Sequence, residues 1–76
     1  MIKVCLSRYG KTTGIYRYIN PNYIIQLHRE DSEYESNIEA ELVNGEKVII
    51  LDDEDLLRLV GPKYYDELKE NTNEKQ

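Results

Sequence analysis

Apolar and polar residues alternate along the first half of the chain, and this pattern predicts β-strands. In residues 2–8 the aliphatic side chains fall on every second position, which is the period of a strand with one buried face. Residues 15–19 and 23–29 are rich in β-branched and aromatic residues, which favours two further strands. Glycines bracket a turn at 9–14, and the Asn-Pro-Asn stretch at 20–22 interrupts the pattern because proline cannot donate to a strand ladder.

The strongest local signal is an Asn44-Gly45 pair between two alternating runs. Such a pair tolerates the positive φ angles of a two-residue type I′ turn, so residues 37–51 are expected to form a hairpin. Counting back from that turn pairs Leu42 with Lys47, Ala40 with Ile49 and Ile38 with Leu51, and sets Glu39 and Glu41 opposite Ile50 and Val48. The preceding segment, 30–36, is acidic and without periodicity and is expected to be a mobile loop.

The period changes after the hairpin, where a helix is predicted. Asp52 suits the N-cap, Asp55 follows three residues later as in a capping box, and acids fill the first turn. Gly61 and Pro62 are expected to end this helix, and residues 63–70 to form a second short one. The side chains expected in the buried stripe are Leu56, Leu57, Leu59 and Val60.

These elements predict an α+β fold, a mostly antiparallel four- to five-stranded sheet or small barrel with one or two short C-terminal helices. Residues 1–70 are expected to form a single small β-rich domain, and residues 71–76 a disordered C-terminal tail. The chain has 76 residues, near the lower size limit for a self-supporting core. It has no Trp or Phe, so the core must use Ile, Leu, Val and some of the seven Tyr.

The single cysteine, Cys5, excludes an internal disulfide framework and a zinc knuckle, and its apolar neighbours predict a buried side chain. No apolar stretch reaches the ~20 residues that span a bilayer. The first residues also lack the long apolar core of a secretory signal. We therefore expect a soluble cytoplasmic protein that does not bind membranes.

Charge is segregated along the chain. The formal net charge is −5, which argues against bulk attraction to nucleic acid, yet residues 1–29 contain cations and no acid. In this segment cations alternate with aromatic rings, and the candidate binding residues are Arg8, Tyr9, Lys11, Tyr16, Arg17 and Tyr18. Three interpretations stay open: internal pairing with Glu39, Glu41 and Glu46, contact with a protein partner such as a second copy, or binding of a nucleotide or single-stranded nucleic acid.

Two stretches resemble parts of a nucleotide-hydrolase site. Residues 10–12 (GKT) match the second half of a phosphate-binding loop, and the apolar strand 47–51 ends in four acids. However, Cys5 occupies the place of the first glycine, and segment 12–19 predicts an extended strand rather than the helix that a phosphate loop needs. The acids at 52–55 are explained by helix capping, so we expect no nucleotide hydrolysis.

Other chemistry is not indicated by the sequence. His28, the only histidine, is expected at the surface or rim of a strand, and no serine or cysteine forms a recognisable triad with it. The acids at 52–55 lack the spacing and the glycine of an EF-hand loop. We predict no catalytic residues, no metal ligands and no cofactor, and therefore no enzyme.

The order of features in "MIKV", "YRYINPNYIIQL" and "AELVNGEKVIILDDEDLLRLV" resembles the small FlbD-type proteins found with bacterial flagellar genes and in phage-like genomes. The resemblance covers about residues 1–60. It rests on Asn20-Pro21, Ile24, Asn44-Gly45 and the strand and cap that follow. It implies a short strand, an Asn-Pro strand, a hairpin and an acid-capped helix, and the LytTR DNA-binding domain has a similar rhythm of strands.

The expected function is that of a non-enzymatic interaction or regulatory module of bacterial or phage type. It would act by protein–protein contact as a homo-oligomer, because a short chain with exposed sheet edges and many tyrosines favours an interface. The alternative is a binder of an anionic ligand, a nucleotide or single-stranded nucleic acid, through the basic, tyrosine-rich segment 8–18.

Overall fold

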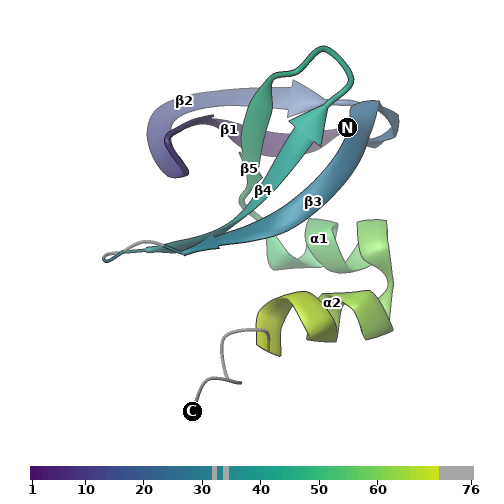
Figure 1. Cartoon of the computed structure of the whole chain (residues 1–76). Helices are drawn as coiled ribbons and strands as arrows, with labels where there is room; N and C mark the ends of the chain where they lie inside the picture. The colour runs from purple at the N-terminus through teal and green to yellow at the C-terminus, as the bar shows by residue number, and fades with distance from the viewer. Residues whose placement is uncertain (32, 34, 71–76) are drawn as a thin grey trace.

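The computed structural model describes residues 1–31, 33 and 35–70. It contains five strands followed by two helices, with a short 3₁₀ turn (Pro21–Tyr23) between the second and third strands (Figure 1). The strands are β1 (Ile2–Arg8), β2 (Lys11–Ile19), β3 (Ile24–Asp31), β4 (Ser36–Leu42) and β5 (Lys47–Ile50), and the helices are α1 (Asp53–Val60) and α2 (Pro62–Glu70). The predicted α+β class is confirmed, and the predicted tail at 71–76 lies outside the described residues.

All five strands belong to one antiparallel sheet, with the order β2-β1-β5-β4-β3. The first strand therefore lies in the interior of the sheet, between β2 and the last strand β5, and β2 and β3 form the two edges. Figure 1 shows a strongly curved sheet with both helices packed together on one side of it. The sheet stays open because β2 and β3 do not pair, so the open form of the two predicted architectures is the observed one.

The main core lies between the sheet and the helices. Alternate positions of β1, β5 and β4 face the helices, and Leu56 of α1 and Leu68 of α2 close the core from the other side. The buried stripe expected on α1 is confirmed for Leu56, and Leu59 and Val60 pack against the core. The prediction that Leu57 is buried is wrong. With 39% of its surface exposed, Leu57 lies outside the buried stripe, because it is about 100° round the helix from Leu56, on the side away from Leu59.

The opposite face of the sheet has a smaller buried layer. Cys5 and Ile49 are neighbours across the β1–β5 ladder, and Glu39 is the partner of Ile49 across the β4–β5 ladder. All three are buried, which confirms the expectation for Cys5 and adds a buried carboxylate to a face that the alternation alone marks as polar. That carboxylate needs polar partners to offset its loss of water.

The turn between β1 and β2 is shorter than the sequence suggests. The predicted turn at 9–14 is wrong, because β2 begins at Lys11 and only Tyr9 and Gly10 connect the strands. Both connecting residues have positive φ angles, 57° and 78°, as a two-residue type I′ turn requires. The turn chemistry expected at Asn44-Gly45 is therefore found here, with a tyrosine in the left-handed region.

The β4–β5 hairpin has a different register from the predicted one. The Leu42 amide donates to the Glu46 carbonyl and the Gly45 amide donates to the Leu42 carbonyl, both at 2.9 Å, so the loop has one residue more than a type I′ turn. Gly45, with φ of 90°, supplies the left-handed residue that closes such a three-residue loop. The observed pairs are Ile38 with Ile50, Glu39 with Ile49, Ala40 with Val48 and Glu41 with Lys47, so the predicted pairing is wrong by one residue.

The acidic loop expected at 30–36 is shorter than predicted, because Glu30, Asp31 and Ser36 belong to strands. The ladder between β3 and β4 continues to Glu30 opposite Asn37 and Asp31 opposite Ser36, so β3 ends later and β4 starts earlier than predicted. These polar residues form strand because they pair with the neighbouring strand. The composition of the segment carries no information on that pairing. The extended conformation expected for residues 12–19 is confirmed, since they lie in β2.

Both predicted helices are present. The Asp52 carboxylate accepts a hydrogen bond from the Glu54 amide at 2.8 Å, which confirms the N-cap of α1. The helix ends at Gly61, whose φ of 87° allows the turn into Pro62, the first residue of α2. In the described part of the chain, neither helix has the length and apolar content needed to cross a membrane.

Candidate functional site

The six predicted binding residues lie on the β1–β2 hairpin but do not form one surface. Tyr16 pairs with Cys5 and Tyr18 with Lys3, so both rings lie on the face of the sheet away from the helices. The Lys3 ammonium lies 4.9 Å from the centre of the Tyr16 ring, a cation–π contact. Arg17 alternates to the other face, so the tyrosines and this cation are separated by the strand itself.

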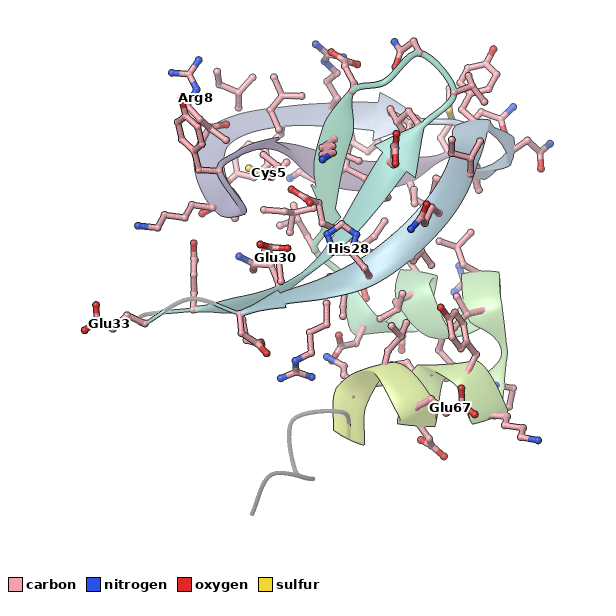
Figure 2. The ribbon with its side chains drawn as sticks, viewed as in Figure 1. Cys5, Arg8, His28, Glu30, Glu33 and Glu67 are labelled. Carbon is pink, nitrogen blue, oxygen red and sulfur yellow. The ribbon has the colours of Figure 1, made fainter. Side chains whose placement is uncertain are left out.

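Internal pairing, one of the three interpretations left open, is found for one of the candidate cations. The Arg17 guanidinium contacts the Glu46 carboxylate at 3.0 Å, and this ion pair joins edge strand β2 to the β4–β5 loop. Both side chains are well exposed, so the pair contributes little to stability. Arg8 and Lys11 are neighbours across the β1–β2 ladder and have no acidic partner among the described residues. Figure 2 shows Arg8 at the outer end of the hairpin.

The edge strand β2 is the most exposed strand of the sheet. Every residue from Lys11 to Tyr18 is exposed, and only Ile19 is buried. The exposed apolar side chains include Ile15, Tyr16 and Tyr18. One side of this strand is paired with β1, and its other side carries backbone groups without a strand partner.

A polar cluster that the sequence did not single out lies on the face away from the helices. His28 Nε2 is 3.1 Å from Glu30 Oε1 and 3.0 Å from Glu39 Oε1. Figure 2 shows His28 and Glu30 on the same side of β3. Their two-residue spacing is visible in the sequence, but the approach of Glu39 depends on its pairing with His28 across the β3–β4 ladder. The expectation of a plain rim histidine is therefore incomplete.

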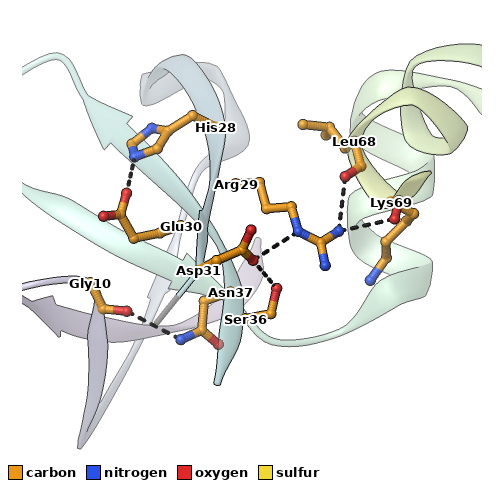
Figure 3. Close-up of polar contacts among 9 residues, drawn as sticks. All are labelled: Gly10, His28, Arg29, Glu30, Asp31, Ser36, Asn37, Leu68 and Lys69. Carbon is orange, nitrogen blue, oxygen red and sulfur yellow. Dashed lines mark hydrogen bonds and ion pairs between the residues drawn. The ribbon is translucent and has the colours of Figure 1, made fainter. Parts of the chain in front are cut away.

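Arg29 faces the helices from the same strand. Its Nη1 donates to the carbonyl oxygens of Leu68 and Lys69 at the end of α2, both at 3.0 Å, and its Nε contacts Asp31 at 3.0 Å (Figure 3). The Ser36 hydroxyl also donates to Asp31. These two partners, Ser36 first and Arg29 second, hold the pKa of Asp31 below its ordinary value. This network attaches α2 to the sheet and has a structural role.

The fold and these contacts define a small α+β protein with an open antiparallel sheet covered on one face by two helices. No protein family, no curated protein and no solved structure matches the chain. The resemblance of residues 1–60 to FlbD-type proteins therefore stays a prediction.

Proposed function

We propose that the protein is a non-enzymatic interaction module that acts by protein–protein contact, and that its partner is a second copy of the same chain bound along β2. The observation that carries this proposal is the exposure of β2 from Lys11 to Tyr18 at an open edge of the sheet. A strand at such an edge offers its free amides and carbonyls to another strand, and its apolar side chains add buried area.

The other edge of the sheet is less suited to pairing. β3 carries four consecutive charged or titratable residues from His28 to Asp31. Both edge strands have one register shift in their ladders, so the difference between the edges is the charge, which keeps sheet edges from pairing with other chains. By contrast, Thr12 to Tyr18 of β2 include one charge, Arg17, which is already paired with Glu46.

The sequence of β2 is compatible with pairing to itself. In a symmetric dimer each residue contacts the same strand of the partner, related by a two-fold axis. With that axis at Ile15, regular antiparallel pairing puts Lys11 opposite Ile19 and Arg17 opposite Thr13, so no two cations face each other. This pairing requires β2 to straighten around Gly14, where its ladder with β1 changes register and φ is 83°. Tyr16 then lies opposite Gly14, where a glycine leaves room for the ring.

Replacing Ile15 by lysine is expected to weaken self-association at least about tenfold, because it puts a charge at the centre of the new ladder. Sedimentation equilibrium over a concentration series measures the effect. The matched control is Ile25→Lys on the opposite edge, since the two isoleucines are 57% and 59% exposed. A wild-type chain that stays monomeric at the highest concentration, or a control as damaging as Ile15→Lys, would contradict the proposal.

A second candidate function, binding of an anionic ligand, is supported by Arg8, Tyr9 and Lys11. They adjoin one another at the β1–β2 turn, both cations lack an acidic partner among the described residues, and the Tyr9 ring is exposed for stacking. The Glu30 side chain lies directly beneath Gly10 of this turn, and its carboxylate repels an anion. For this reason anion binding ranks second to self-association.

The double replacement Arg8→Ala and Lys11→Ala is expected to reduce binding of an oligothymidine or of ATP at least about tenfold at low salt, with a shallower salt dependence. Fluorescence anisotropy with a labelled oligothymidine measures the first, and titration calorimetry the second. Arg17→Ala is the control, because that cation is already held by Glu46. If the wild-type chain binds neither ligand at low salt, this candidate function is contradicted.

A further inference from the structure

The cluster of His28, Glu30 and Glu39 brings three metal-binding side chains together on one face of the sheet. One ligand atom from each residue lies within 4.8 Å of the other two. His28 and Glu30 extend from alternate positions of β3, and Glu39 reaches them from β4, directly opposite His28 in the ladder. The three donors therefore come from paired strands, whose backbone positions are fixed by hydrogen bonds.

Glu39 is the anchor of this cluster because only 6% of its side chain is exposed. Its Oε1 contacts His28 Nε2, and its Oε2 accepts a hydrogen bond from the Ser7 hydroxyl at 2.5 Å. The second contact fixes the orientation of the carboxylate from β1, as the outer partners of metal ligands commonly do. A bound cation stabilises a carboxylate buried in this way, because it replaces the hydration that the charge has lost.

The β1–β2 turn is held close to the cluster. The Asn37 side-chain amide donates to the Gly10 carbonyl at 3.2 Å (Figure 3), and a Cβ at Gly10 would lie only 2.6 Å from Glu30 Cγ. The cluster opens into a pocket of ≈ 300 Å³ lined by Ser7, Tyr9, Gly10, His28, Glu30, Glu39 and Lys47. This pocket leaves space for water molecules that would complete the coordination of a cation.

We propose that His28 Nε2, Glu30 and Glu39 bind a divalent transition cation of the zinc class. One imidazole and two carboxylates suit such a cation better than Mg²⁺, which prefers oxygen ligands alone. Donors placed at about 2.0–2.1 Å around a tetrahedral zinc lie about 3.3 Å apart. The two His28 contacts, 3.0 and 3.1 Å, need to lengthen only slightly. Glu30 is the more exposed carboxylate and can rotate to complete the site.

Two charges decide how tightly the site binds. Cation binding uses the neutral imidazole of His28, so a proton on Nε2 competes with the metal. Lys47 lines the same pocket and repels a cation, although it lies opposite Glu41 in the β4–β5 ladder. Replacing Lys47 by methionine is therefore expected to tighten binding several-fold.

Titration of the untagged protein with Co²⁺ and Zn²⁺ tests this proposal. We expect one equivalent to bind per chain, visible calorimetrically and as Co²⁺ absorption without a thiolate band, since Cys5 is buried. His28→Ala and Glu39→Gln should each weaken binding at least about tenfold, and Ser7→Ala by about tenfold through loss of orientation. Glu41→Gln is the matched control, because Glu41 lies two residues from Glu39 on the same strand and outside the cluster.

A second measurement separates loss of the site from loss of the fold. Zn²⁺ should raise the melting temperature of the wild type and of Glu41→Gln, but not that of His28→Ala. Because His28 is the only histidine, its ring ¹⁵N signals report directly whether Nε2 binds the metal. No binding by the wild type, equal binding by a folded His28→Ala, or equal loss in Glu41→Gln would overturn the proposal.

Discussion

Replacing Leu56 by alanine is expected to lower the free energy of unfolding by about 3 kcal/mol. Leu56 is the residue of α1 that is fully enclosed between helix and sheet, with 1% of its surface exposed. Removing its side chain loses transfer free energy and leaves a cavity, because the β-sheet opposite cannot move inward. Urea denaturation followed by far-ultraviolet circular dichroism measures the change, and the slope of the transition should stay constant.

The neighbouring leucine is the control for this prediction. Leu57→Ala removes the same atoms from an exposed position on the same helix, so it should cost less than about 1 kcal/mol. Equal effects at the two positions would mean that α1 does not pack on the sheet through the face described above.

Replacing Arg29 by methionine is expected to destabilise the protein by about 2 kcal/mol and to release the end of α2 first. The Arg29 side chain is 17% exposed, and its guanidinium bonds two α2 carbonyls that otherwise have no intrahelical donor. Methionine keeps the apolar stem but leaves those carbonyls without this partner. Hydrogen exchange should show α2 losing protection at lower denaturant than the strands.

Arg58→Met is the matched control for the Arg29→Met replacement. The Arg58 side chain is 72% exposed and, among the described residues, pairs only with Asp55 on its own helix, so its loss should cost about 0.5 kcal/mol or less. If Arg58→Met destabilises the chain as much as Arg29→Met, the contact between β3 and α2 does not hold the helix.

The contact between Arg29 and Asp31 also determines how the stability of the protein depends on pH. Hydrogen bonds from Ser36 and Arg29 lower the pKa of Asp31 in the folded state, below its ordinary value of 3.8. Its contribution to stability is therefore complete above that value and is lost as the pH falls through the lower folded pKa. In Arg29→Met this loss below about pH 4 should become smaller, because one of the two partners is gone.

The elements were predictable from the sequence wherever one local cause dominates. The N-cap at Asp52, the glycine end of α1 and the extended segment 12–19 each follow from the chemistry of a few adjacent residues. The register of the β4–β5 hairpin was not predictable in this way. Asn44-Gly45 suits both a two-residue and a three-residue loop, and core packing of Ile38 and Val48 on one face selects the longer loop.

The site was less predictable than the fold because it depends on strand order. The candidate residues lie close together in sequence, yet alternation puts Tyr16 and Tyr18 on one face of β2 and Arg17, which pairs with Glu46, on the other. His28 and Glu39 are eleven positions apart and meet only because β3 and β4 pair in one particular register. Local patterns carry no information on such contacts until the ladder is known.

The position of β1 between β2 and β5 also determines the order in which the molecule can assemble. The β1–β2 hairpin and the β3–β4–β5 meander each join neighbouring segments, so both can form early. Their seam joins Val4 to Ile50 and Leu6 to Val48, contacts that close a long stretch of chain. During synthesis on the ribosome both outer edges of the N-terminal hairpin therefore stay unpaired until β5 has emerged and can pair with β1.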